Sequence, residues 1–415
     1  MRKYAKDTRP DVKPVIKVEL NGENQKWRIV AIALLIAIGV TLIASAGVKL
    51  LGKNKGYVEI EVEDSIFADF FTLNYDIGAS GVVASVDYRT VREAYTDALN
   101  KYCRLFSADT EYEQLVNIAY INAHPGEDIK VDPVLYAALL KMENEGKGRH
   151  YLGISLEIYD ALFYLEGDDY AAGQDPSKNE ELRAINLQAC EFARDRESVN
   201  LTFLGNDTLR LDIGEEYASF AVKHGFSRYI DLGIFENAFV TDAIADLLVG
   251  KGMTLGAISS YDGYTRNLDT RDLDYSFSFY AKSGDVVYPV CDVKYKGSIA
   301  TYSARTYPIS DTSALDFYLY ATGESAHRFI DPISGEYKSS IDEILLTSNS
   351  KGCASLALIA YSTITSDSFN GAELSGVDAV WLDGKTVRYI GSGISISSPY
   401  SDENIAFSIQ SENQN

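Results

Sequence analysis

Beyond residue 55, the chain contains segments in which hydrophobic residues recur at every second position and segments in which they recur with the helical period of about 3.6 residues. Residues 57–62 alternate between polar and apolar positions and lead into an apolar run at 67–71, so a strand is predicted within 56–75. Thr90-Val91-Arg92-Glu93 has the pattern of a capping box, and apolar residues then recur with a helical period from Ala94 to Cys103. Further helices are predicted over about 111–121, 132–144, 153–166, 178–195 and 238–249, the last with Gly250 as its C-cap.

Beyond residue 252 the pattern changes from helices to strands. Short segments rich in Tyr, Phe, Ser and Val follow one another, interrupted by one apolar helix-like stretch near 351–364. Residues 377–389 contain an Asp-Gly turn between apolar residues, which predicts a hairpin. Helices and strands do not alternate with regular βαβ spacing, so the pattern favours an α+β sheet with helices on one face over a doubly wound sheet.

One segment near the N-terminus predicts a transmembrane helix. Residues 29–48 contain no charged side chain, and about 20 helical residues reach about 30 Å, the thickness of a bilayer's hydrocarbon core. Ala44-Ser45-Ala46 resembles a signal-peptide cleavage site, but signal peptides have apolar cores of only about 7 to 15 residues. We therefore predict a basic cytoplasmic tail at 1–28, a transmembrane helix at 29–51, an exported domain at 56–395 and a polar C-terminal tail at 396–415.

Charge separates the N-terminal segment from the rest of the 415-residue chain. Residues 1–55 carry a net charge of +7, and the total of −22 leaves −29 for the remainder. Nucleic acids attract proteins through clustered Lys and Arg, so nucleic acid is excluded as a partner of the exported region. The basic excess before the apolar segment predicts that the N-terminus is cytoplasmic and that the main domain lies outside the cytoplasm. This is a single-pass arrangement in the cell membrane.

The usual catalytic and metal-binding motifs are absent from the sequence. The sequence contains no P-loop, HExxH or GxSxG motif and no dinucleotide-binding GxGxxG after a strand, and it has only four histidines. The four cysteines are far apart and form no CxxC pair, which leaves zinc sites unsupported. Cys103 and Cys353 lie among apolar residues and are predicted to be buried free thiols, although the sequence leaves disulfides open.

Three segments carry the remaining signal, and their order is informative. Residues 231–242 read DLGIFENAFVTD, residues 326–335 read AHRFIDPISG, and residues 353–358 read CASLAL; Ile299-Ala300-Thr301 precedes the second segment. In this order they resemble the DLGGIAKGYAVD, HIIDPxTG and ADALAT motifs of the ApbE-like FAD:protein FMN transferases, with Ile299-Ala300-Thr301 similar to the start of the family's IATSG. The resemblance extends over about residues 70–390 and implies an ApbE-like (T-fold-like) antiparallel sheet with packed helices.

What the resemblance implies for function is a flavin site and a Mg²⁺ site. Enzymes of this family are exported and attach FMN from FAD to Ser or Thr of partner proteins. Carried over position by position, the flavin-binding residues would be Gly233, Asn237, Phe239, Thr301, His327, Asp331 and Gly335. The flavin would be FAD or FMN, and the partner an exported flavoprotein or redox protein.

The catalytic and metal positions depart from the family's pattern. Asn237 replaces the family's lysine, and Ala354 and Leu358 replace the Asp and Thr that hold Mg²⁺. Neither Ala nor Leu offers the oxygen that a hard divalent cation needs, so no metal ligand and no catalytic residue is predicted. The expectation is a membrane protein that has lost FMN transfer. An active transferase with an altered site and a non-enzymatic binding or scaffold module are the alternatives.

Several of these residues also have a purely structural interpretation. Asp331-Pro332-Ile333-Ser334-Gly335 has the composition of an ordinary turn, with Pro fixing φ and Gly allowing a positive φ. His327, next to Arg328, is more typical of a surface histidine than of a catalytic one, and Asn237 has the position of a polar cap at the start of a helix.

Overall fold

The computed structural model describes residues 55–412 apart from residue 63, segments 166–169, 284–285, 310–315 and 402–405, and residues 375 and 398. All of these belong to one compact unit, residues 55–415. The predicted cytoplasmic tail and the transmembrane helix at 29–51 lie outside the described residues. Within the described part of the chain, no helix is both long and apolar enough to cross a membrane.

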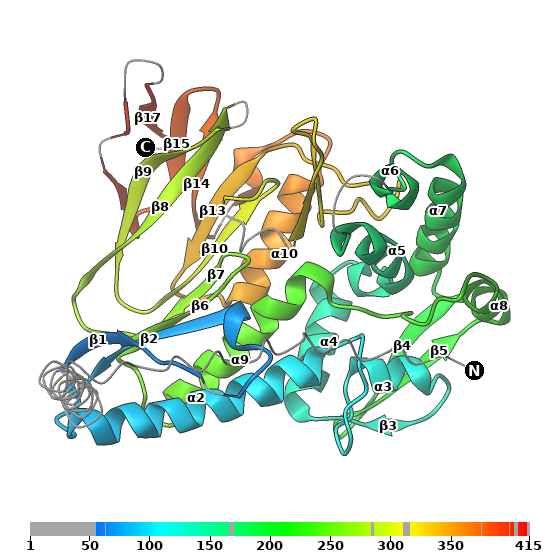
Figure 1. Ribbon diagram of the computed structural model, residues 1–415, viewed down its shortest axis with the longest axis horizontal. Coiled ribbons are helices and arrows are strands. Elements are labelled where there is room, and N and C mark those ends of the chain that lie inside the picture. The colour runs from blue at the N-terminus through cyan, green and yellow to red at the C-terminus, as the bar shows by residue number, and fades with distance from the viewer. Residues whose placement is uncertain are drawn as a thin grey trace, which may run out of the picture. The chain divides into compact units, whose positions relative to one another are not determined.

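A nine-stranded sheet forms the centre of this unit (Figure 1). All neighbouring strands are antiparallel except β15 and β17, which are parallel. In spatial order its strands are β1 (Gly56–Glu59), β2 (Phe71–Ile77), β6 (Gly256–Ser260), β7 (Tyr264–Asn267), β10 (Ile299–Arg305), β13 (Glu343–Ser348), β14 (Asp378–Asp383), β15 (Thr386–Ile390) and β17 (Ser408–Ser411). The α+β class with a largely antiparallel sheet is thus confirmed.

Three helices cover one face of the central sheet. α9 (Glu236–Gly250) packs against β6 and β7, and α10 (Cys353–Ile364) packs against β10 and β13. α2 (Ala84–Phe106) lies on the outer side of α9 and contributes a buried stripe that includes Val91, Leu99 and Phe106. α9 and α10 are largely buried because both are enclosed between the sheet and other elements.

A second, three-stranded sheet lies against the opposite face near β13 to β15. Its strands are β8 (Asp274–Ser283), β9 (Val286–Lys296) and β16 (Ile394–Ile396), in the order β16-β9-β8. β13 is buried at every position because it lies between this sheet and the helices. Ile344 and Leu346 face the main core, whereas Leu345 packs with the side chains of β8 and β9.

The remaining helices gather beside the central sheet with a small sheet of their own. They are α3 (Ile118–Ala123), α4 (Pro133–Glu145), α5 (Gly153–Phe163), α6 (Ala171–Gln174), α7 (Glu180–Arg194) and α8 (Glu215–His224). The small sheet has the order β3 (Ile129–Lys130), β5 (Thr208–Ile213), β4 (Val199–Gly205). A separate pair, β11 (Phe317–Leu319) and β12 (Ser325–His327), contacts α5. Short 3₁₀ helices occur at Ala68–Phe70, Arg149–Tyr151, Gly233–Phe235 (η4) and Gly371–Leu374.

Three predicted helix ends are wrong. The helix predicted over about 111–121 is α3, which begins only at Ile118. α2 begins at Ala84, so Thr90 lies inside the helix and its hydroxyl donates to the carbonyl oxygen of Val86 at 2.9 Å. The true start is held by Asp87, whose carboxylate accepts from the backbone N–H of Gly78 at 2.7 Å, a long-loop contact that the local pattern does not encode. α9 includes Gly250, and the left-handed residue after it is Gly252, with φ of 77°.

The C-terminal part confirms one prediction and adds one strand. β14 and β15 form the predicted antiparallel hairpin around Gly384. The segment 396–415, predicted as a polar tail, contains β17, which pairs with β15 at the edge of the main sheet. All four cysteines are buried and free, as predicted for Cys103 and Cys353.

Candidate functional site

The DLG segment forms a fixed loop at the entrance to α9. The Asn122 amide oxygen accepts from the backbone N–H groups of Tyr229 and Ile230 at 3.1 and 2.9 Å, and its nitrogen donates to the carbonyl oxygen of Ile230 at 2.8 Å. Asp231 is buried, and its carboxylate accepts from the N–H of Gly233 at 2.7 Å. Gly233 has a φ of 53°, a conformation that favours glycine. η4 and α9 follow this turn directly.

A cavity of about 330 Å³ opens in front of this loop. It is enclosed by residues from α2, α5, the loop before η4, the start of α9, the β6–β7 turn and the segment around β11 and β12. Its aromatic walls are Phe67, Phe70, Phe71, Tyr112, Tyr164 and Tyr261. Its charged residues are Asp109, Asp160, Asp231, Glu236, Asp262, Asp316, Arg228 and Arg328. Among the described lining residues, carboxylates therefore outnumber guanidinium groups by six to two.

Both arginines of the cavity are already paired. Nη1 of Arg228 lies 2.9 Å from a carboxylate oxygen of Asp109 and 3.0 Å from one of Asp231, and its Nη2 also pairs with Asp160. Arg328 pairs through Nη1 with Asp160 at 2.8 Å and through Nε with Asp316 at 3.3 Å. An incoming anion would have to compete with these carboxylates, so the two arginines do not form a free phosphate site.

Two carboxylates of the cavity have no cationic partner. Asp262 accepts from Nδ2 of Asn237 at 3.0 Å and from the hydroxyl of Ser260, both neutral groups. The carboxylate of Glu236 makes no hydrogen bond or ion pair with any described residue. Burial, together with the charge of Asp316, raises the pKa of Asp262 to about 7. Burial and the nearby Asp231 raise the pKa of Glu236 well above its usual range. The cavity therefore contains two carboxyl groups with raised pKa values, which hold their protons more tightly than ordinary carboxyl groups do.

These raised pKa values predict how stability depends on pH. Because the folded state raises the pKa of Asp262 from 3.8 to about 7, this group favours folding at low pH, and that contribution is lost as the pH rises through 7. Asp262→Asn should remove it, so the variant should lose less stability than the wild type between pH 5 and pH 8, by about 3 kcal/mol at most. Urea denaturation of both proteins at the two pH values measures this difference. Parallel pH curves for both proteins would contradict the assignment.

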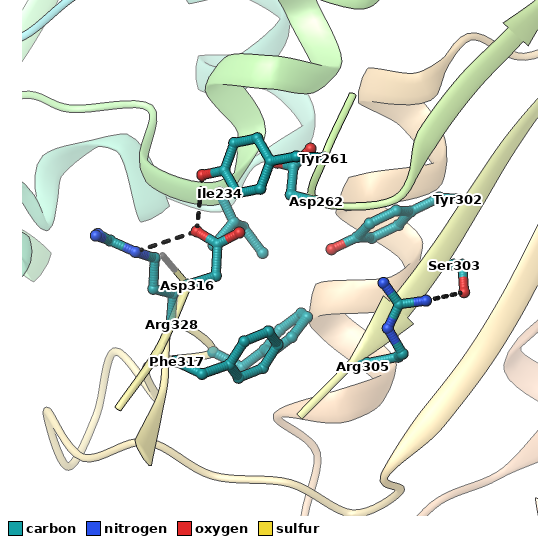
Figure 2. Close-up of a pocket in the computed structure, with 10 residues that line it drawn as sticks. Ile234, Tyr261, Asp262, Tyr302, Ser303, Arg305, Asp316, Phe317 and Arg328 are labelled. Carbon is teal, nitrogen blue, oxygen red and sulfur yellow. Dashed lines mark hydrogen bonds and ion pairs between the residues drawn. The ribbon is translucent and has the colours of Figure 1, made fainter. Parts of the chain in front are cut away.

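A smaller recess of about 30 Å³ adjoins the main cavity (Figure 2). Ile234, Tyr261, Asp262, Asp316 and Arg328 line both spaces. The recess is completed by Tyr302, Ser303, Arg305, Phe317 and Phe329. The ring of Tyr302 stacks on that of Tyr264 with centroids 4.0 Å apart, which fixes this wall.

Of the predicted flavin-binding residues, Gly233 and Asn237 line the main cavity. Asn237 lies within α9 and binds Asp262, so it is not a cap of the helix. Phe239 and Thr301 are in the core instead. Phe239 packs against Phe106 with ring centroids 5.9 Å apart, and Thr301 is buried in β10.

The other three predicted residues lie beside α5 and α7, with His327 and Gly335 buried and Asp331 partly exposed. His327 is buried rather than on the surface, with its ring against Phe329 and Tyr337, and burial lowers its pKa to about 4. Asp331 and Gly335 form a turn in which the N–H of Gly335 donates to the carbonyl oxygen of Asp331 at 2.8 Å. The carbonyl oxygen of Gly335 accepts from Tyr159 and Asn186. These residues anchor the turn and do not line either space.

The residues that replace the family's metal ligands do not fit Mg²⁺. Ala354 and Leu358 are buried on α10 and have no side-chain oxygen. Asp242, the last residue of the DLG segment, is already occupied: its two carboxylate oxygens accept from the N–H groups of Cys353 and Ala354 at 2.9 and 3.0 Å. Nη1 of Arg266 lies 2.6 Å from the same carboxylate. Among the described residues, no group of three or more His, Cys, Asp or Glu is arranged to hold a metal ion.

Glycine at position 352 makes this contact possible. A Cβ atom there would lie 2.4 Å from Oδ2 of Asp242. Asp242 therefore acts as the N-terminal cap of α10 from a distance of more than a hundred residues, with Arg266 as its counterion. The positive charge of Arg266 already balances the negative charge of the Asp242 carboxylate.

Sequence reasoning missed most of the cavity. Asp160, Asp262, Asp316 and Arg305 belong to no motif, and each resembles an ordinary surface or turn residue in its local sequence. Asp262-Gly263, for example, reads as a simple turn. The one available signal was the position of Glu236 inside the DLG segment, next to Asn237.

Comparison with known proteins supports the fold. The ApbE protein of Thermotoga maritima superposes with a TM-score of 0.53 at 14% sequence identity, covering 78% of this chain and 94% of that one. A point mutant of the flavin transferase ApbE from Vibrio cholerae matches with a TM-score of 0.48 at 14% identity, covering 83% and 97% of the two chains. No protein-family model matches the sequence, and no curated protein does. The chain thus has the fold of ApbE.

Proposed function

We propose that this protein is a membrane-anchored, exported protein with an ApbE-like fold that binds a ligand in its cavity and does not transfer FMN. The observation that carries the proposal is the state of Asp242. Its two oxygens are taken up by the start of α10 and by Arg266, and the neighbouring Ala354 offers no metal ligand. The residues therefore do not fit the Mg²⁺ that the resemblance implies.

The charge of the cavity supports the same conclusion. FMN transfer from FAD concentrates negative charge on the diphosphate, and an enzyme must stabilise that charge in the transition state. Here six carboxylates face the cavity and both of its arginines are paired within the protein. Asn237, in the place of the family's lysine, donates to Asp262 and supplies no positive charge.

Retention of a cavity favours a binding role over a purely structural one. The space has aromatic walls and several polar groups, as small-molecule sites commonly do. With the anchor at 29–51 the domain would be held at the outer surface of the membrane, where an exported flavoprotein or redox protein is the partner that the resemblance suggests. Such a partner would be captured stoichiometrically and would not be modified.

The direct test is to supply the full-length protein with everything that a transferase needs. Purified protein in detergent is incubated with FAD, Mg²⁺ and a protein acceptor bearing a Ser or Thr site, and AMP release is followed by chromatography. We expect no AMP above the rate without protein. An active ApbE transferase in the same mixture shows that the acceptor is competent. Steady, Mg²⁺-dependent AMP release would refute the proposal and favour an active enzyme with an altered site.

A further inference from the structure

Arg305 is a buried arginine that faces the smaller recess. It is the last residue of β10, only 9% of its surface is exposed, and it lines the recess together with Tyr302 and Phe317 (Figure 2). Its position at the end of a central strand makes the guanidinium part of a rigid wall. Tyr302 and Phe317 lie beside the guanidinium, so a ligand would reach it from the recess.

No carboxylate among the described residues forms an ion pair with Arg305. Its one hydrogen bond runs from Nη1 to the neutral hydroxyl of Ser303 at 3.0 Å, and its Nε, although buried, has no hydrogen-bond partner. The nearby carboxylate of Glu343 accepts from the hydroxyl of Tyr307 and, at 3.5 Å, from the hydroxyl of Ser303. A buried guanidinium without a direct ion pair is unfavourable, and the buried carboxylates of Glu343 and Asp316 interact with it electrostatically without forming one.

We propose that Arg305 binds the carboxylate of a small zwitterionic ligand whose ammonium group lies in the main cavity near Glu236 and Asp262. A guanidinium presents parallel N–H donors that match the two oxygens of a carboxylate. A phosphate dianion fits less well, because the adjoining cavity contains six carboxylates and would repel a second negative charge.

The other end of the cavity suits the ammonium group. The carboxylate of Glu236 has no hydrogen bond or ion pair with a described residue, and that of Asp262 has only neutral donors, so both can accept from an N–H donor. The aromatic walls formed by Phe70, Tyr112 and Tyr261 favour a cation near their faces. Asp262 borders both spaces, so a ligand that reaches from the recess into the adjoining cavity would pass this carboxylate. The ligand class is that of amino acids, and the inference does not depend on flavin binding.

The ligand prediction is tested with simple probes on the full-length protein in detergent. Calorimetric titrations use 3-aminopropanoate, 5-aminopentanoate and 7-aminoheptanoate, with pentanoate, pentylamine and inorganic phosphate for comparison. We expect at least one amino acid of the series to bind about tenfold more tightly than pentanoate, pentylamine and phosphate. If none of the three binds better than the singly charged probes, or if phosphate binds best, the proposal is wrong.

Variants separate a binding role of Arg305 from a structural one. Arg305→Met should weaken binding of the best probe by about tenfold or more, whereas Arg305→Lys should retain part of it. Without ligand, Arg305→Met should unfold at the same temperature as the wild type or higher, since no ion pair is lost. Arg210→Met, at a solvent-accessible pair with Asp212 on β5, is the matched control and should leave binding unchanged. Unchanged binding by Arg305→Met, or a clearly lowered unfolding temperature, would overturn the proposal.

Discussion

Replacing Asp242 with alanine is expected to destabilise the folded protein by about 3 kcal/mol or more. The substitution removes the acceptor for two backbone N–H groups at the start of α10 and leaves Arg266 without its closest counterion. Loss of a helix cap costs about 1 kcal/mol, and breaking a largely buried ion pair costs about 3 to 5 kcal/mol. Both side chains are less than 20% exposed, so solvent screens the pair only weakly. Urea denaturation measures the loss.

Asp246 provides the matched control because it contacts the same arginine. Its carboxylate lies 3.5 Å from Nη2 of Arg266, but its side chain is 73% exposed. Exposed ion pairs contribute about 0 to 1 kcal/mol, so Asp246→Ala should be close to the wild type. Asp242→Asn keeps a cap acceptor and loses the charge, and its stability should lie between the two. Equal effects of Asp242→Ala and Asp246→Ala would show that Asp242 is free to serve a ligand, as a metal site would require.

The second large effect concerns flavins. Riboflavin is expected to bind at least as tightly as FAD, and we expect the affinity for FAD to be lower by about tenfold, which is about 1.4 kcal/mol. The ring system of a flavin can use the aromatic walls at Tyr261 and Tyr302, whereas the diphosphate of FAD meets an excess of carboxylates. Phe239 and the turn at Asp331 do not take part, since they lie outside the cavity.

Magnesium should not change this order. Because Asp242 is occupied and Ala354 offers no ligand, Mg²⁺ should alter FAD affinity less than twofold, which calorimetric titration with and without a chelator measures. At pH 8, where Asp262 is largely ionised, Asp262→Asn should bind FAD more tightly than the wild type, because one source of repulsion is removed. Tight FAD binding that disappears on chelation would show that a metal site exists and that the alignment of residues 353–358 with the family's metal motif is wrong.

The sequence alone determined the features that depend on local pattern. The helical period places α5, α7, α9 and α10 within a few residues of their predicted ranges, because an amphipathic or apolar run of that length has one suitable conformation. The Asp-Gly turn of the β14–β15 hairpin is likewise a local property. The order of the DLG, DPxSG and CASLAL segments was enough to indicate the ApbE-like fold, since the order and spacing of separate segments depend on the fold and not on one local pattern.

Other features were missed because their local signal is weak. The hairpin of β4 and β5 turns at Asn206 and Asp207, both with positive φ, and no Asn-Gly or Asp-Gly pair marks it. α8 is short, and its amphipathic pattern covers little more than two turns. The capping box at Thr90 was misleading because the helix had already started, held by the contact of Asp87 with the loop before it.

Only the tertiary structure decided what the candidate site is. Arg328 and Asp160 are 168 residues apart, and Asp242 lies 111 residues before the N–H group that it caps. His327 is buried against the rings of Phe329 and Tyr337, although its immediate neighbours Ala326 and Arg328 do not indicate burial. The charge of a side chain is written in the sequence, but whether that charge is paired depends on which distant elements the fold brings within about 4 Å of it.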